Sequence, residues 1–213
     1  DQYKVFNGFG EESLLRTINI LKKENVEITE KIKGLKILYA NISITEKMRY
    51  LCTKCGILGA INLLMNQFEN NSEINEYCGL ILEKISVLDE VVEMMDKIGT
   101  FQLLIKVIKN SNQSIKAKCA AISCIQTIAL KFTSCQILLN QRRIIEDLVN
   151  VLDQDLSNER FIYLIVDSLR LMTGSCSKGR NIAAKAGILK AIEKILLRNN
   201  FKDNETIMTT TSA

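Results

Sequence analysis

Apolar residues recur along the chain in one pattern that is repeated five times. Within each copy they follow one another at spacings of three and four residues, which predicts a helix with a single buried stripe. Consecutive copies lie 43, 43, 44 and 44 residues apart, beginning at Ser13, Gly56, Gly99, Arg143 and Gly187. Where glycine begins a copy, it can adopt the left-handed conformation that ends one helix and turns the chain into the next.

Another, more apolar helix is predicted after each of the first four copies. Polar turns at 70–72, 110–112 and 155–157 precede three of these helices and contain residues that cap a helix N-terminus well. The helices end at matching positions 43, 43 and 44 residues apart, which are Ile42, Ile85, Ile128 and Met172. Shorter helices, such as 87–98 and 177–186, lead into the next copy, so the repeat unit has three helices.

An all-helical repeat with a period in the low forties is typical of armadillo and HEAT arrays. The three-helix unit and the Gly-Ile-Leu junctions, as at 187–189, resemble the armadillo-repeat family from residue 13 to about residue 200. The resemblance implies an all-α, right-handed superhelical solenoid of four to five three-helix repeats. We therefore predict one armadillo-repeat domain over residues 1–213, with 201–213 as a C-terminal cap or a truncated helix. The alternative is a four-helix bundle with accidental periodicity, against which five ungapped copies argue.

The family resemblance also predicts a binding groove. In armadillo proteins the third helix of each repeat lines a concave groove, and nuclear-import adaptors carry a Trp and, four residues later, an Asn on each of these helices. The corresponding pairs here are Ile37/Asn41, Leu80/Lys84, Ser123/Thr127 and Asp167/Leu171. Every Trp is replaced and only Asn41 keeps the Asn. We predict a non-enzymatic scaffold that binds segments of other proteins, with an importin-like cargo or transport adaptor with an altered groove as the alternative.

Charge is segregated along the chain although its formal net value is only +4. Residues 69–96 hold eight acidic residues and one basic residue, whereas residues 97–143 hold eight basic residues and no acidic one. Residues 144–173 are acidic again and 178–202 are basic. In one interpretation these charges neutralise neighbours in stacked repeats. In the other, a basic patch docks an acidic partner segment, so that charge reversal at Lys116 and Lys118 weakens partner capture. That predicted patch consists of Lys106, Lys109, Lys116, Lys118 and Lys131.

Residue usage argues against several kinds of chemistry. The chain has no His, which removes the usual general base and the commonest zinc ligand, so we predict neither an enzyme nor a metal or cofactor site. Cys52 and Cys55 form a CxxC pair without the further ligands that zinc needs. The seven Cys are expected to be reduced thiols of a cytosolic protein. Trp is absent, which disfavours nucleic-acid binding, and a monomer is expected.

The chain is rich in Ile, Asn and Lys and has no Pro. With a body made only of armadillo repeats, it is similar to the armadillo-repeats-only branch of apicomplexan proteins. The resemblance implies a lipid-anchored protein on the cytosolic face of the rhoptry, which positions this organelle through partners that include a myosin motor and adaptor proteins. No run of 18 apolar residues spans a membrane. The resemblance implies that the anchor is N-terminal acylation upstream of Asp1.

Overall fold

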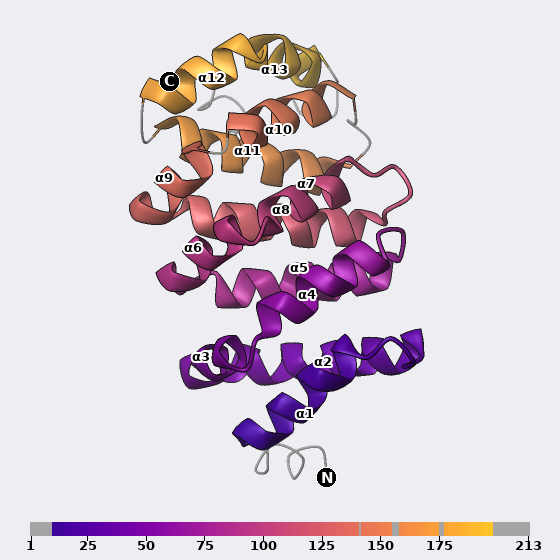
Figure 1. Cartoon of the computed structure of the whole chain (residues 1–213). Coiled ribbons are helices and arrows are strands. Elements are labelled where there is room, and N and C mark those ends of the chain that lie inside the picture. The colour runs from indigo at the N-terminus through magenta and orange to yellow at the C-terminus, as the bar shows by residue number, and fades with distance from the viewer. Residues whose placement is uncertain (1–9, 141, 155–157, 175–176, 198–213) are drawn as a thin grey trace.

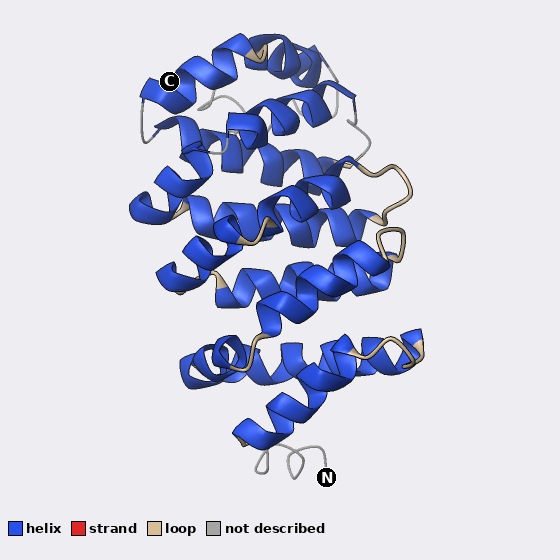
Figure 2. Cartoon of the chain, viewed as in Figure 1, coloured by secondary structure: helices blue, strands red, loops and turns tan. Residues whose placement is uncertain are grey.

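The computed structural model describes residues 10–140, 142–154, 158–174 and 177–197. Within these ranges the chain forms thirteen helices and no strand (Figures 1 and 2). The predicted all-α solenoid is confirmed. The predicted cap at 201–213 and the turn at 155–157 lie outside the described residues.

The helices form three sets that recur in the same order along the chain. The short helix is counted as the first helix of each repeat. The second helices are α1 (Glu11–Lys22), α4 (Ile57–Gln67), α7 (Thr100–Lys109), α10 (Arg142–Gln154) and α13 (Ile188–Leu197). The third helices are α2 (Ile28–Ile44), α5 (Ser72–Ile85), α8 (Ile115–Ala129) and α11 (Glu159–Gly174). The short helices are α3 (Glu46–Lys54), α6 (Asp89–Lys97), α9 (Phe132–Asn140) and α12 (Ser177–Lys185). Figure 1 shows the repeats stacked from α1 at one end to α13 at the other, with α3, α6 and α9 along one side.

Three glycines make the turn from a short helix into a second helix. Gly56, Gly99 and Gly187 have φ angles of 79°, 77° and 86°, and no other described residue has a positive φ. A residue with a Cβ is strained in this conformation. The sequence prediction of left-handed glycines at these three junctions is confirmed.

Polar side chains cap the third helices, although not always where the sequence predicted. The Oδ1 of Asn71 accepts a hydrogen bond from the backbone N–H of Ile74 at 3.0 Å, as expected for a cap in the turn at 70–72. The prediction for 110–112 was wrong, because the cap of α8 is Ser114. Asn110 instead ends α7, and its amide donates to Asn70 Oδ1 at 3.0 Å in the preceding repeat. This side chain therefore joins two repeats rather than starting a helix.

A single hydrophobic core runs through the described part of the solenoid, from Leu14 on α1 to Ile195 on α13. Apolar side chains of all four third helices belong to this core. The residues at the matching ends of these helices are fully buried, namely Ile42, Ile85, Ile128 and Met172. Each repeat therefore buries its apolar stripe only by stacking on its neighbours, which is the defining property of a solenoid.

A buried lysine closes the end of the first helix. Lys31 is almost fully buried on α2, and its Nζ donates to the carbonyl oxygens of Leu21 at 2.8 Å and Lys23 at 2.6 Å. These carbonyls lie at the C-terminus of α1, where no helical N–H is left to pair with them. Burial lowers the pKa of Lys31, against a smaller opposing effect of Glu24. Lys31 is thus a structural cation rather than part of an exposed basic surface.

Candidate functional site

The eight predicted groove residues lie on four consecutive third helices, which pack side by side in the order α2, α5, α8, α11. We call these positions the third-helix face. Ile37 is 42 % exposed, whereas Asn41 and Asp167 are buried. The others are half-buried and comprise Leu80, Lys84, Ser123, Thr127 and Leu171. The structure therefore places all eight in one layer, at equivalent positions of successive repeats.

Asn41 is the only Asn on the third-helix face that matches the import-adaptor ladder. Its Nδ2 donates to the carbonyl oxygen of Ile37 on its own helix at 2.7 Å. One of the two amide N–H groups is therefore used within α2, and the residue is only 4 % exposed, so little of it is open to a bound peptide. The third-helix face therefore differs from that ladder even at the one position where the residue type is kept.

A polar network occupies the other end of the third-helix face. Asp167 accepts a hydrogen bond from Gln126 Nε2 at 2.6 Å, across the interface between α8 and α11. Arg170 donates to the same carboxylate from Nε at 2.8 Å and forms an ion pair through Nη2 at 2.7 Å. Neighbouring groups thus satisfy this mostly buried carboxylate. The face changes from apolar at Ile37 and Leu80 to polar at Asp167.

An aromatic pair beside the apolar end was not predicted from the sequence. Tyr39 on α2 and Tyr77 on α5 meet edge to face with ring centroids 6.2 Å apart. Lys36 Nζ lies 5.5 Å from the Tyr77 ring centroid and pairs with Glu73 at 2.8 Å. The hydrogen bond to Glu73 raises the pKa of Lys36. The presence of one tyrosine on each of two adjacent predicted third helices could have indicated this contact.

The predicted basic patch is divided among three places. Lys106 and Lys109 lie on α7, Lys116 and Lys118 on α8, and Lys131 in the turn before α9. Lys118 is only 8 % exposed, and its Nζ lies 5.6 Å from the ring centroid of Phe161. The structure therefore does not gather the five lysines into a single exposed surface. Reversing the charge of Lys118 would test folding as well as docking.

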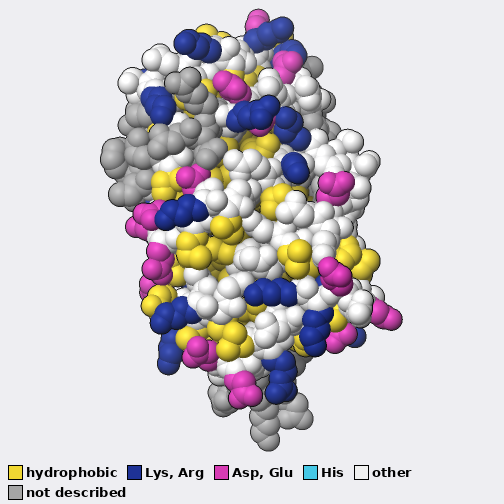
Figure 3. All heavy atoms as spheres, viewed as in Figure 1, with side chains coloured by type: hydrophobic (Ala, Val, Ile, Leu, Met, Phe, Trp, Pro, Cys, Tyr) yellow, Lys and Arg dark blue, Asp and Glu magenta, His cyan; other side chains and the backbone are white. Residues whose placement is uncertain are grey.

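Charges of opposite sign pair between neighbouring repeats. Lys109 contacts Asp147 at 2.7 Å, and Lys131 contacts Asp89 at 3.2 Å while also donating to the Val87 carbonyl. Lys194 pairs in the same way with Asp153. Each pair joins a basic block of the sequence to an adjacent acidic block. On the face shown in Figure 3, positive and negative side chains are interspersed. The interpretation of mutual neutralisation is therefore favoured for these lysines.

The Asp89 pair predicts a specific acid sensitivity. Hydrogen bonds from Ser134 and Lys131 lower the pKa of Asp89 below its ordinary value of 3.8. The folded state then binds fewer protons than the unfolded state, so this contribution to stability is present above that pH and is lost as the pH falls. We expect Asp89→Asn to reduce the drop in urea midpoint between about pH 5 and about pH 3. The control is Glu90→Gln, since exposed Glu90 makes no ion pair with a described residue. Equal pH profiles for the two variants would contradict the assignment.

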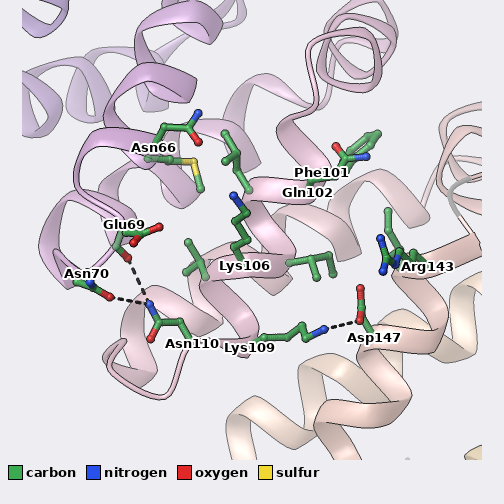
Figure 4. Close-up of a pocket in the computed structure, with 15 residues that line it drawn as sticks. Asn66, Glu69, Asn70, Phe101, Gln102, Lys106, Lys109, Asn110, Arg143 and Asp147 are labelled. Atoms are coloured by element: carbon green, nitrogen blue, oxygen red, sulfur yellow. Dashed lines mark hydrogen bonds and ion pairs between the residues drawn. The ribbon is translucent and has the colours of Figure 1, made fainter.

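A surface pocket of about 830 Å³ lies on the second helices, where three consecutive repeats meet (Figure 4). We call it the second-helix pocket. Residues of α4, α7 and α10, together with the turn after α4, line it, including Glu69, Lys106, Lys109, Arg143 and Asp147. Lys106 and Lys109 belong to the predicted basic patch, whereas Arg143, which begins the fourth copy of the repeat pattern, was not included in it.

The CxxC pair shows no sign of reactive chemistry. Cys52 and Cys55 are both buried and unbridged, and burial, with a smaller contribution from Cys55, raises the pKa of Cys52 to about 12. A nucleophilic or metal-binding cysteine needs its thiolate form, which this environment disfavours. Among the described residues, no group of three or more His, Cys, Asp or Glu side chains is placed to hold a metal ion.

No helix in the described part of the chain is long and apolar enough to cross a bilayer.

The fold matches solved structures of armadillo-repeat proteins, although no known protein family and no curated protein matches the sequence. A designed armadillo repeat protein in complex with the peptide (KR)4 has a TM-score of 0.79 and 16% sequence identity, over 94% of this chain and 81% of that chain. A second match belongs to computationally designed armadillo repeat proteins for modular peptide recognition, with a TM-score of 0.80 and 16% identity over 94% and 82% of the two chains. An engineered protein has a TM-score of 0.77 and 14% identity over 94% and 78%. The chain has an armadillo-like fold.

Proposed function

We propose that this protein is a non-enzymatic scaffold that binds segments of partner proteins along the third-helix face. The observation that carries the proposal is the alignment of equivalent side chains on four stacked helices, which offers one position per repeat to an elongated ligand. The designed proteins of similar fold were made for peptide recognition or hold a peptide, which supports the same use of the fold here. The apolar end at Ile37 and Leu80 would receive an apolar side chain of the partner.

Substitution at the apolar end tests this proposal. We expect Ile37→Asp to weaken partner binding by about tenfold, because a carboxylate would replace an apolar contact in the bound state. The readout is recovery of partners from an extract of the source organism, followed by a titration with the partner that is identified. Met94→Asp is the matched control, since Met94 is 41 % exposed but lies on the short helix α6. Equal recovery by the two variants would contradict binding at this face.

The importin-like alternative makes a different prediction. A cargo adaptor would bind basic import peptides, for which (KR)4 is a suitable probe because a designed protein of similar fold is known with it. The replaced Trp positions and the burial of Asn41 argue against such binding. We expect no saturable binding of (KR)4, and tight binding would favour the transport function.

We further propose that the scaffold acts on the cytosolic side of the rhoptry membrane, positioning the organelle through a myosin motor and adaptor proteins. The support is compositional, namely a chain rich in Ile, Asn and Lys, without His or Pro, made of armadillo-type repeats. Attachment would need two acyl chains, because a single chain gives only marginal membrane binding.

The full-length gene tests this placement directly. We expect it to encode Gly at position two followed closely by Cys, and the tagged protein to lie on rhoptries. A protein without this start that is spread through the cytosol would contradict the rhoptry proposal and leave the scaffold proposal intact.

A further inference from the structure

We propose that the second-helix pocket is a second docking surface, which binds an acidic protein segment that carries an apolar anchor. The pocket is formed by α4, α7 and α10, whereas the third-helix face is formed by α2, α5, α8 and α11. The two surfaces therefore use different sets of helices. An interaction at the pocket would allow the scaffold to hold two partners at once.

The charge that remains after internal pairing is positive. Three cations and two acidic residues line the pocket. Lys109 and Asp147 neutralise each other at 2.7 Å. Lys106 and Arg143 are exposed and make no ion pair or hydrogen bond with a described residue. Two cations are therefore available to a ligand.

Glu69, the other acidic residue of the lining, lies away from Arg143. Figure 4 shows Glu69 at the end of the pocket near Asn70 and Asn110, with Lys106 between it and Arg143. The backbone carbonyl of Glu69 accepts a hydrogen bond from Gln113 at 2.7 Å, which fixes this turn to the next repeat. Lys106 and Arg143 are thus the two lining cations without an ion pair to a described residue, and carboxylates of a ligand would be attracted to them.

The rest of the lining combines four amide side chains with apolar ones. The apolar side chains of Met65, Phe101, Ile105 and Ile144 are almost completely buried and belong to three neighbouring helices. A polar rim around an apolar floor is typical of a protein-binding site. An acidic segment with one apolar side chain would place that side chain on this floor and its carboxylates near Lys106 and Arg143.

Nucleic acid fits the pocket less well. Phosphates would meet the two cations, but the only aromatic ring in the lining, that of Phe101, is 1 % exposed and offers no face for a base to stack on. The pocket therefore favours a protein segment.

Fluorescence anisotropy with two probes tests the proposal. One probe is a fluorescein-labelled peptide of alternating glutamate and leucine, and the other is a labelled thymidine oligonucleotide. We expect the whole chain to bind the peptide saturably at low salt, more weakly at high salt, and in preference to the oligonucleotide. The double variant Lys106→Glu/Arg143→Glu should weaken peptide binding by about tenfold or more. The charge-preserving variant Lys106→Arg/Arg143→Lys should retain it.

Two controls distinguish binding at the pocket from a general effect of net charge and from binding at the third-helix face. Lys47→Glu/Lys185→Glu changes the net charge equally at exposed positions on the short helices α3 and α12 and should leave binding unchanged. Ile37→Asp on the third-helix face should also leave it unchanged. The proposal is overturned if wild type does not bind the peptide, if the pocket variant binds it normally, if either control weakens binding equally, or if the oligonucleotide binds more tightly.

Discussion

Replacing Gly79 with alanine is expected to lower the free energy of unfolding by about 2–4 kcal/mol. A Cβ at this position would lie 2.9 Å from both the carbonyl carbon and the Cβ of Ala120, and 3.0 Å from the backbone nitrogen of Ala121. These atoms belong mainly to the backbone of α8, which cannot rotate away as a flexible side chain can. The substitution must therefore separate two stacked third helices in the middle of the solenoid.

Gly59 provides a control with the opposite expected sign. It lies within α4, and a Cβ there meets nothing within 4 Å. Gly59→Ala should raise stability by about 0.5–1 kcal/mol, because alanine loses less conformational entropy than glycine on forming a helix. Urea denaturation followed by circular dichroism measures both changes. Similar effects of the two substitutions would show that α5 and α8 do not pack as closely as described.

Reversing the charge of Lys118 is expected to destabilise the fold by about 2–4 kcal/mol. Its ammonium group lies over the ring of fully buried Phe161, and the face of an aromatic ring attracts a cation and repels a carboxylate. Lys118→Glu would bury that carboxylate in the interface between α8 and α11. Loss of partner binding in this variant would accordingly reflect loss of structure.

Lys116→Glu is the matched control from the same predicted patch. Lys116 is exposed and makes no hydrogen bond or ion pair with a described residue, so its substitution should change stability by less than about 0.5 kcal/mol. Thermal unfolding of the two variants makes the comparison. If they lose stability equally, Lys118 is not buried against Phe161.

The repeat and its junctions could be predicted from the sequence because local chemistry decides them. A glycine with a positive φ angle ends each of three short helices, and the apolar stripe recurs at helical spacing. The glycine junctions and the apolar stripe are both local features of the sequence, so they can be recognised without knowing how the repeats stack. The equivalent buried ends at Ile42, Ile85, Ile128 and Met172 follow from the same period.

Charge along the sequence did not indicate which lysines of the predicted basic patch are exposed and which are buried or paired. Lys116 and Lys118 are two residues apart, which places them on different sides of an α-helix, one exposed and the other buried. Lys109 is partly neutralised by Asp147, a residue of the next repeat. Such pairing depends on the stacking of repeats, which a count of charges does not contain.

The second-helix pocket also could not be predicted from charge along the sequence, because the stacking of repeats brings its residues together. Arg143 joins Lys106 at the pocket because α10 stacks on α7, although the two residues are far apart in the sequence. The Tyr39–Tyr77 pair also arises from two helices one repeat apart.

Site-specific photo-crosslinking tests the proposed binding face most directly. A photoreactive phenylalanine analogue at Leu80, on the third-helix face, should form an adduct with a partner in an extract of the source organism. The same analogue at exposed Leu189 on α13 should not form this adduct. Excess unlabelled wild-type protein should suppress the Leu80 adduct, and excess Ile37→Asp protein should not. An adduct formed equally at both positions, or suppressed equally by both competitors, would contradict a scaffold that binds partner segments on its third helices.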